Sequence, residues 1–338
     1  MGGHLDGRLG RNRRRRRARG IAILVLVTAT VTGLGGPTAE PASAAVDPDS
    51  YQGVYAGFAA VRARAGGYLS CPPGRKAVAG GAYLPSVDGS LTALSPTTDG
   101  DGWYVAATLR TSPWPELTAF GMCVPAAQVA AASTIVVRDH RDRNDFHVQQ
   151  SCPAGQLALA GGGFLHRPGE DPDPTDLDAG YTLISRPTAD GTGWEHAVSN
   201  TGGDGDRDHT FVLRCLTASE LPGAVGVTSI STIPARRTRG LVPVPAAGFA
   251  RCPSGTSVYA GGGVFTKANR ELIGGVSTSA PAFDGSGWHM TGIGPGGGTL
   301  TVTARCVPRP RVIGGDTGGI LQSPRDDKAP VVAEIAGS

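Results

Sequence analysis

One pattern occurs three times along this chain of 338 residues, and it limits the fold more than any other feature. Each copy begins with Cys-Pro-x-Gly and has an Ala-Gly-Gly run that starts eight residues after the cysteine. An Asp-Gly-x-Gly-Trp segment follows, and a second cysteine closes the copy 18 to 21 residues after the tryptophan. Agreement at so many offsets indicates a tandem repeat of one structural unit.

The glycine and proline content argues against a mainly helical fold. The chain contains 52 Gly and 26 Pro, which is roughly twice the share of an average protein, and both residues destabilise long helices. The runs that end at the second cysteine of each copy, such as Leu117 to Cys123, are short, partly alternating and bounded by turns, as strands are. We therefore predict an all-β protein of three tandem disulfide-stapled antiparallel β-sandwich-like repeats.

The first 44 residues have the features of a secretory signal peptide. Arginines from Arg11 to Arg19 precede the apolar stretch 21–27 and the small-residue segment Ala42-Ser43-Ala44. We expect cleavage near Ala44, a secreted extracellular product and no membrane span in the mature chain; general or twin-arginine export both stay open. Loss of the leader changes the formal net charge from +3 to −3, so we expect no nucleic-acid partner.

Six cysteines in an exported chain predict three disulfides. Six cysteines allow 15 connectivities, and the repeat selects pairing within each copy. The expected pairs are Cys71–Cys123, Cys152–Cys215 and Cys252–Cys306. Each bridge is expected to stabilise its unit by about 4 kcal/mol.

The repeat also sets the expected domain boundaries. We predict repeat 1 at residues 51–126, repeat 2 at 133–220 and repeat 3 at 227–309, followed by a flexible tail at 310–338. The best candidate for a helix is a short linker segment from Pro125 to Ala132.

Four tryptophans are the candidate binding residues. Trp103, Trp194 and Trp288 occupy the repeated position, where the main expectation is a core side chain packed against the disulfide and the alternative is a stacking platform for sugars. Trp114 lies outside the repeat, between two prolines, and is the better candidate for an exposed binding aromatic.

Repeat 2 carries the only candidate metal ligands that the sequence suggests. Asp204, Asp206 and Asp208 alternate in an acidic segment and offer the oxygen ligands that Ca²⁺ prefers. His209 and Cys215 stand where an EF-hand-like loop needs Gly and Glu, so a solvated acidic loop without a cofactor is the main expectation. Zinc binding by the histidines is disfavoured because no pair has close ligand spacing.

Catalytic motifs give no support for an enzyme. Segment 311–319 has a superficial similarity to two protease motifs, but no matching histidine motif precedes it. The sequence contains no Gly-x-Ser-x-Gly elbow, phosphate-binding loop or His-Glu-x-x-His motif.

The repeated motifs resemble a module found in exported proteins of actinobacteria, over about Tyr51 to Pro308. A content of 28 Arg and 3 Lys fits a high-GC bacterial source. The resemblance implies no catalytic role. The chain is also faintly similar to vitelline membrane outer layer protein, whose three repeats form a β-prism. This resemblance implies a single pseudo-threefold β-prism as the alternative fold, although the units here are longer and each is expected to have its own disulfide.

Three function classes follow. The first is a secreted, non-catalytic binding module whose partner is a polysaccharide or cell-wall polymer. The second is a structural component of an envelope or extracellular matrix, and the third is an extracellular hydrolase or protease inhibitor. The sequence leaves the ligand and the oligomeric state open.

Overall fold

The computed structural model contains 18 strands and three short 3-10 helices in the residues that it describes. These are residues 45–60, 63–85, 89–109, 116–141, 145–168, 180–199, 207–234, 243–267 and 274–309. Repeat 1 forms η1 (Pro48–Ser50), β1 (Gln52–Phe58), β2 (Arg64–Ser70), β3 (Arg75–Tyr83), β4 (Gly89–Pro96), β5 (Gly102–Leu109), β6 (Leu117–Pro125) and η2 (Ala126–Val129). Repeat 2 forms β7 (Ser133–Arg141), β8 (Phe146–Ser151), β9 (Gln156–His166), β10 (Tyr181–Pro187), β11 (Gly193–Ser199), β12 (Arg207–Thr217) and η3 (Ala218–Glu220). Repeat 3 forms β13 (Val225–Thr232), β14 (Pro243–Arg251), β15 (Thr256–Thr266), β16 (Gly275–Pro281), β17 (Gly287–Pro295) and β18 (Thr299–Pro308).

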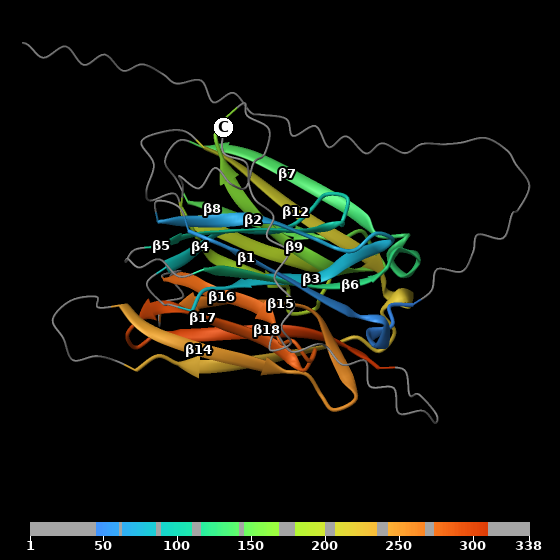
Figure 1. Ribbon diagram of the computed structural model, residues 1–338. Coiled ribbons are helices and arrows are strands. Elements are labelled where there is room, and N and C mark those ends of the chain that lie inside the picture. Colours follow the sequence, from blue (N-terminus) through green and yellow to red (C-terminus); the bar gives the residue numbers. More distant parts are fainter. Residues whose placement is uncertain are drawn as a thin grey trace, which may run out of the picture. The chain divides into compact units, whose positions relative to one another are not determined.

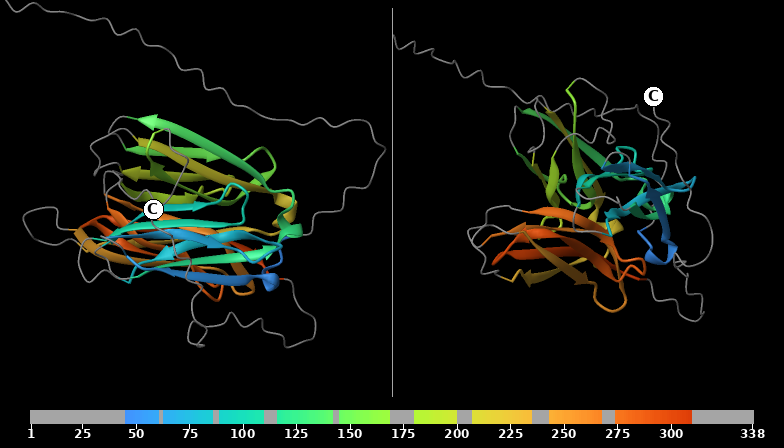
Figure 2. Two further views of the ribbon diagram at one scale, coloured as in Figure 1. Left: turned by 45° about the horizontal axis from the view of Figure 1, so that its top comes forward. Right: turned by 60° about the vertical axis from the view of Figure 1, so that its left-hand side comes forward.

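The strands form three six-stranded antiparallel sheets, and every sheet is shared by two repeats (Figure 1). Sheet A has the order β1-β6-β3-β16-β17-β14, sheet B has β2-β5-β4-β9-β12-β7, and sheet C has β13-β18-β15-β10-β11-β8. Each repeat therefore gives its first, third and sixth strands to one sheet and its second, fourth and fifth strands to another. Figure 2 shows the orange strands of repeat 3 continuing the blue and cyan strands of repeat 1 in this way.

The all-β prediction with disulfide-bonded repeats is confirmed, and the sharing of sheets corresponds to the pseudo-threefold prism among its two arrangements. The repeats are units of sequence, but none of them closes a sheet of its own. The predicted linker helix is the 3-10 helix η2. The leader 1–44 and the tail 310–338 lie outside the described residues.

The two glycines of each Ala-Gly-Gly run have different packing roles. A Cβ on the first glycine would overlap the indole ring of the tryptophan in the same repeat, as at Gly261 against Trp288. A Cβ on the second glycine would overlap a backbone carbonyl of the neighbouring repeat, as at Gly262 against Ser185. The same overlaps occur in the other two repeats at Gly80, Gly81, Gly161 and Gly162. The motif therefore specifies both the core and the junction between repeats.

The three repeated tryptophans are buried in the core, with exposed fractions of 1 to 2%. The indole Nε1 of Trp194 donates to Ser185 Oγ at 3.1 Å, and that of Trp288 donates to Ser279 Oγ at 3.0 Å. Leu94 occupies the corresponding position in repeat 1, and Trp103 Nε1 has no hydrogen-bond partner among the residues that the structure describes.

Removing one of these serine hydroxyls leaves a buried donor unpaired. We expect Ser279→Ala to lower the free energy of unfolding by about 1–3 kcal/mol, measured by urea denaturation. The matched control is Ser95→Ala, because the Ser95 hydroxyl is buried but donates to the carbonyl of Pro96 and not to a tryptophan. Equal losses of stability in the two variants would contradict the role of the Ser279 hydroxyl as the acceptor for the buried indole N–H of Trp288.

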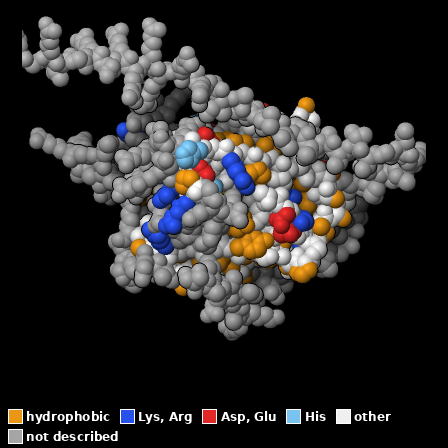
Figure 3. All heavy atoms as spheres, turned by 90° about the horizontal axis from the view of Figure 1, so that it is seen from above, with side chains coloured by type: hydrophobic (Ala, Val, Ile, Leu, Met, Phe, Trp, Pro, Cys, Tyr) orange, Lys and Arg blue, Asp and Glu red, His pale blue; other side chains and the backbone are white. Residues whose placement is uncertain are grey.

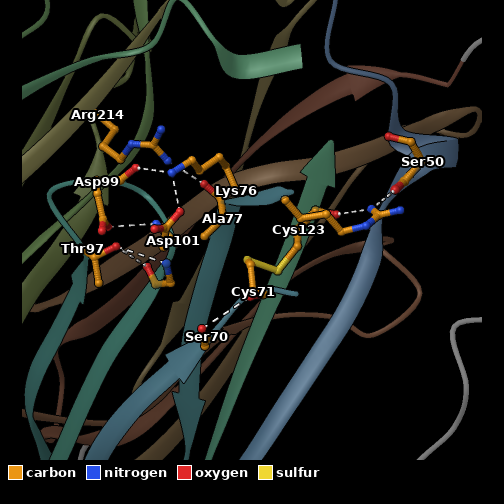
Figure 4. Close-up of a disulfide and its surroundings, with 12 residues drawn as sticks. Ser50, Ser70, Cys71, Lys76, Ala77, Thr97, Asp99, Asp101, Cys123 and Arg214 are labelled. Carbon is orange, nitrogen blue, oxygen red and sulfur yellow. Dashed lines mark hydrogen bonds and ion pairs between the residues drawn. A yellow bond between two sulfur atoms is a disulfide. The ribbon is translucent and has the colours of Figure 1, made fainter. Parts of the chain in front are cut away.

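The three disulfides pair as the repeat predicts, with Cα–Cα distances of 5.9, 5.8 and 5.8 Å. In each, the first cysteine directly follows a strand of one sheet and the second lies in a strand of another. Cys71 follows β2 of sheet B, for example, and Cys123 lies in β6 of sheet A (Figure 4). Each bridge therefore ties two sheets together at the point where the chain passes between them.

Buried arginines connect two of the three pairs of neighbouring repeats. Arg214 in β12 donates from Nη1 to the carbonyl of Ala77, at 2.9 Å, and covers Gly100 in the hairpin turn of repeat 1 (Figure 4). Arg305 in β18 covers Gly191 in the hairpin turn of repeat 2 in the same manner. Burial lowers the pKa of Arg214, and the carboxylates of Asp99 and Asp101 oppose this effect. At the third junction the corresponding residue is Met122.

Candidate functional site

The outward face of sheet A carries two clusters of aromatic side chains. Successive residues of a strand point to opposite faces, so His289 points outward because Trp288 points into the core. Phe249 pairs with His289 across the strands and stacks on its ring at a centroid distance of 4.2 Å. On the other half of the sheet Tyr55 pairs with Phe120.

These aromatic residues line a groove of about 960 Å³ on sheet A. The ring of Phe283, in the turn between β16 and β17, meets Phe120 of repeat 1 edge-on at 4.4 Å. Tyr83 and Phe283 are 42% and 45% exposed, so both rings are accessible to a ligand. The residues that complete the lining are Tyr55, Gly57, Glu116, Thr118, Phe249, Arg251, Thr278, Ala280, Pro281, Ala282, Asp284, Ser286, His289 and Thr291.

Charged groups of both signs lie at the groove. Arg251 lies over the Phe249 ring at 5.1 Å from its centroid, a cation–π geometry. Burial alone would raise the pKa of Asp284, but hydrogen bonds from Ser286 and the charge of Arg309 lower it below its ordinary value. Burial lowers the pKa of His289, which Asp284 opposes. With Glu116 the groove therefore holds two carboxylates, one guanidinium and one neutral imidazole at pH 7.

The pseudo-threefold arrangement provides an internal comparison for this face. Six positions on this face of sheet A hold Tyr55, Phe120, Tyr83, Phe283, His289 and Phe249. In the same order, the equivalent positions of sheet B hold Val136, Val212, Phe164, Thr98, Tyr104 and Tyr68. In sheet C they hold Thr228, Thr303, Val264, Ala189, Glu195 and Gln149. At these positions sheet A therefore has five phenylalanine and tyrosine rings, sheet B has three, which contact one another, and sheet C has none, so the fold itself does not require aromatic side chains there.

The tryptophans predicted as binding candidates do not form this groove. Burial of Trp103, Trp194 and Trp288 confirms the expectation of a core role, and the sugar-platform alternative for them is wrong because a ligand cannot reach buried rings. Trp114 lies outside the described residues.

The predicted calcium ligands are only partly described. Asp204 and Asp206 lie outside the described residues. The carboxylate of Asp208 is 2.6 Å from Nδ1 of His140, with which it forms an ion pair when the imidazole is protonated. Among the residues that the structure describes, no group of three or more His, Cys, Asp or Glu side chains is arranged to hold a metal ion.

Repeat 2 also contains a buried pair of histidines. The rings of His196 in β11 and His209 in β12 stack at 5.2 Å with an interplanar angle of 7°, and Nδ1 of His196 lies 3.1 Å from Nε2 of His209. Both side chains are fully buried. Burial lowers the pKa of His196 well below its ordinary value, with smaller contributions from His209 and His147. His196 is therefore neutral at pH 7.

The sequence did not identify the groove because its two halves come from distant parts of the chain. Tyr55, Tyr83 and Phe120 belong to repeat 1, whereas Phe249 and Phe283 belong to repeat 3. One signal was available, since the residue after the repeated tryptophan points outward and differs between repeats. Its neighbours in space depend on the strand pairing between repeats 1 and 3.

A scan against models of protein families and a search of curated proteins give no match for this chain. Within the described ranges, no helix is long and apolar enough to cross a membrane. Three disulfides are compatible with a secreted protein. Figure 3 shows one face of the molecule, on which basic, acidic and hydrophobic side chains are interspersed.

Proposed function

We propose that this protein is a secreted, non-catalytic binding module and that the groove on sheet A binds a glycan of a cell envelope. The observation that carries the proposal is the gathering of three phenylalanines and two tyrosines in one open groove. Ligand sites typically combine apolar and aromatic walls with a few polar groups that fix orientation.

Sugars present two kinds of surface, and the groove matches both. Their C–H faces are apolar and pack on aromatic rings, for which the exposed rings of Tyr83 and Phe283 are placed. Their hydroxyl groups donate and accept hydrogen bonds, and the groove supplies acceptors at Asp284 and a donor at Arg251. Large exposed apolar patches mark interaction sites, which separates this face from the equivalent face of sheet C.

The test is retention on polysaccharides. The secreted chain is applied to a glycan array and to purified bacterial cell walls, and we expect Phe283→Ala to weaken binding by about tenfold or more because buried aromatic contacts dominate such interfaces. Tyr68→Ala is the matched control, since Tyr68 is a comparably exposed aromatic on sheet B. If the wild-type chain is retained on no glycan and no cell wall, the proposal is wrong and the structural role gains support.

A further inference from the structure

We propose that the groove takes a neutral, extended polysaccharide segment of about four to five sugar units that lies across the strands of sheet A. This inference rests on the proposed function and adds the charge, the shape and the length of the ligand. Three observations carry it: the strands that contribute to the groove, the residues of its floor, and its charge.

The groove extends over the full width of the sheet. All six strands of sheet A contribute, from Tyr55 in the edge strand β1 to Phe249 in the opposite edge strand β14. Adjacent strands lie about 4.8 Å apart, so the two edges are about 24 Å apart. A monosaccharide would cover only a fraction of this width, whereas an extended chain of four to five units would reach from one edge to the other.

The floor of the groove is a row of small side chains that runs perpendicular to the strands. Gly57 pairs with Thr118, Thr118 with Tyr83, Tyr83 with Thr278, and Thr278 with Thr291. Apart from Tyr83, every member of this row is glycine or threonine. An extended chain laid along the row meets the half-buried Thr118 and Thr291 on its path, and the rings of Tyr55 and Phe249 lie on the two edge strands.

The charges at the groove favour a neutral polymer. Two carboxylates, Glu116 and Asp284, and the guanidinium of Arg251 line the groove, and the guanidinium of Arg309 donates to the backbone carbonyl of Asp284. The acidic and basic groups therefore balance, and the lowered pKa of His289 keeps its ring uncharged at neutral pH. An anionic polymer would be repelled by both carboxylates. Hydroxyl groups of a neutral sugar can donate to them.

The experiment is a titration series followed by calorimetry. The probes are β-1,4-linked glucose and β-1,4-linked N-acetylglucosamine oligomers of one to six units, with a hexamer of galacturonic acid as the anionic comparison. For at least one neutral series we expect the Kd to fall by about tenfold or more between the dimer and the pentamer and to change little from pentamer to hexamer. Tyr55→Ala and Phe249→Ala should each weaken hexamer binding and leave trimer binding within about twofold, because each ring lies at one edge of the sheet.

The possible results separate the two proposals. If neutral monomers bind as tightly as hexamers, or if the uronate hexamer binds most tightly, the inference is overturned while the proposed function stands. If the wild-type chain binds no oligomer of any length and is also retained on no glycan or cell wall, both are overturned. Self-association at the concentrations used, abolished by Phe283→Ala, would show that a second copy of the chain occupies the groove and would also overturn the inference.

Discussion

Replacement of Gly262 by valine is expected to lower the free energy of unfolding by more than about 4 kcal/mol, at the upper end of single-residue effects. The Cβ of any side chain there would overlap the carbonyl oxygen of Ser185 in β10, and the clash is with backbone, which no rotamer change can relieve. At this junction β10 and β15 are in register at two residue pairs, Ile184 with Val264 and Ser185 with Gly263. The measurement is the urea midpoint of the purified variant, or its yield of folded protein.

The matched control for this glycine is Gly255→Ala. Gly255 has a positive φ of 78°, but a Cβ added there would meet no atom within 4 Å, so only backbone strain of about 1 kcal/mol is expected. A Gly262→Val variant that is no less stable than Gly255→Ala would contradict the close packing of repeats 2 and 3 in sheet C.

The double variant His196→Met/His209→Leu is expected to be less sensitive to acid than the wild type. The two histidines stand where repeat 3 has Met290 and Leu300, both of which are buried. The folded-state pKa of His196 is depressed, so the unfolded chain takes up a proton below pH 6.5 that the folded chain does not. Keeping His196 neutral in the folded state therefore contributes stability that is fully present above pH 6.5 and is lost as the pH falls towards the folded-state pKa of His196.

The size of the effect follows from the linkage. One proton bound only by the unfolded state costs about 1.4 kcal/mol per pH unit, or about 2 kcal/mol between pH 6.5 and pH 5. The measurement is urea denaturation of both proteins at pH 7.5, 6.5, 5.5 and 5.0. Carboxylates titrate in both proteins, so their contribution cancels in the difference. A difference in stability between the two proteins that does not change over this pH range would contradict the depressed pKa of His196.

The strands and disulfides were predictable from the sequence because they depend on local patterns. Gly100 and its counterparts Gly191 and Gly285 have φ values of 70° to 75° in the hairpin turns before the repeated tryptophans, and an Asp-Gly-x-Gly segment is typical of such turns because glycine adopts positive φ freely. The cysteines pair within repeats, as expected from the two cysteines that each copy of the repeated pattern contains. Glycines inside a strand are typical of a bulge or a close backbone approach. The Ala-Gly-Gly run forms both, since a register shift precedes Ala260 and Gly262 lies against the carbonyl of Ser185.

The groove could not be predicted because it depends on which strands become neighbours. The pairing of Tyr83 with Thr278 brings together residues nearly 200 positions apart, and neither residue carries a motif that indicates the other. The buried histidines were likewise visible as residues but not as a pair. Their contact requires β11 of sheet C and β12 of sheet B to face each other across the core.

The most direct test of the central claim, that the groove on sheet A is the ligand site, is hydroxyl-radical footprinting with the neutral hexasaccharide that binds most tightly. Tyr83, Phe283 and Tyr68 are all exposed enough to be oxidised in the free protein. Because a bound ligand excludes solvent from the rings that it covers, we expect it to reduce oxidation of Tyr83 and Phe283 severalfold and to leave Tyr68 on sheet B unchanged. Protection of Tyr68 with continued oxidation of Tyr83 and Phe283 would place the site on another face and contradict the account.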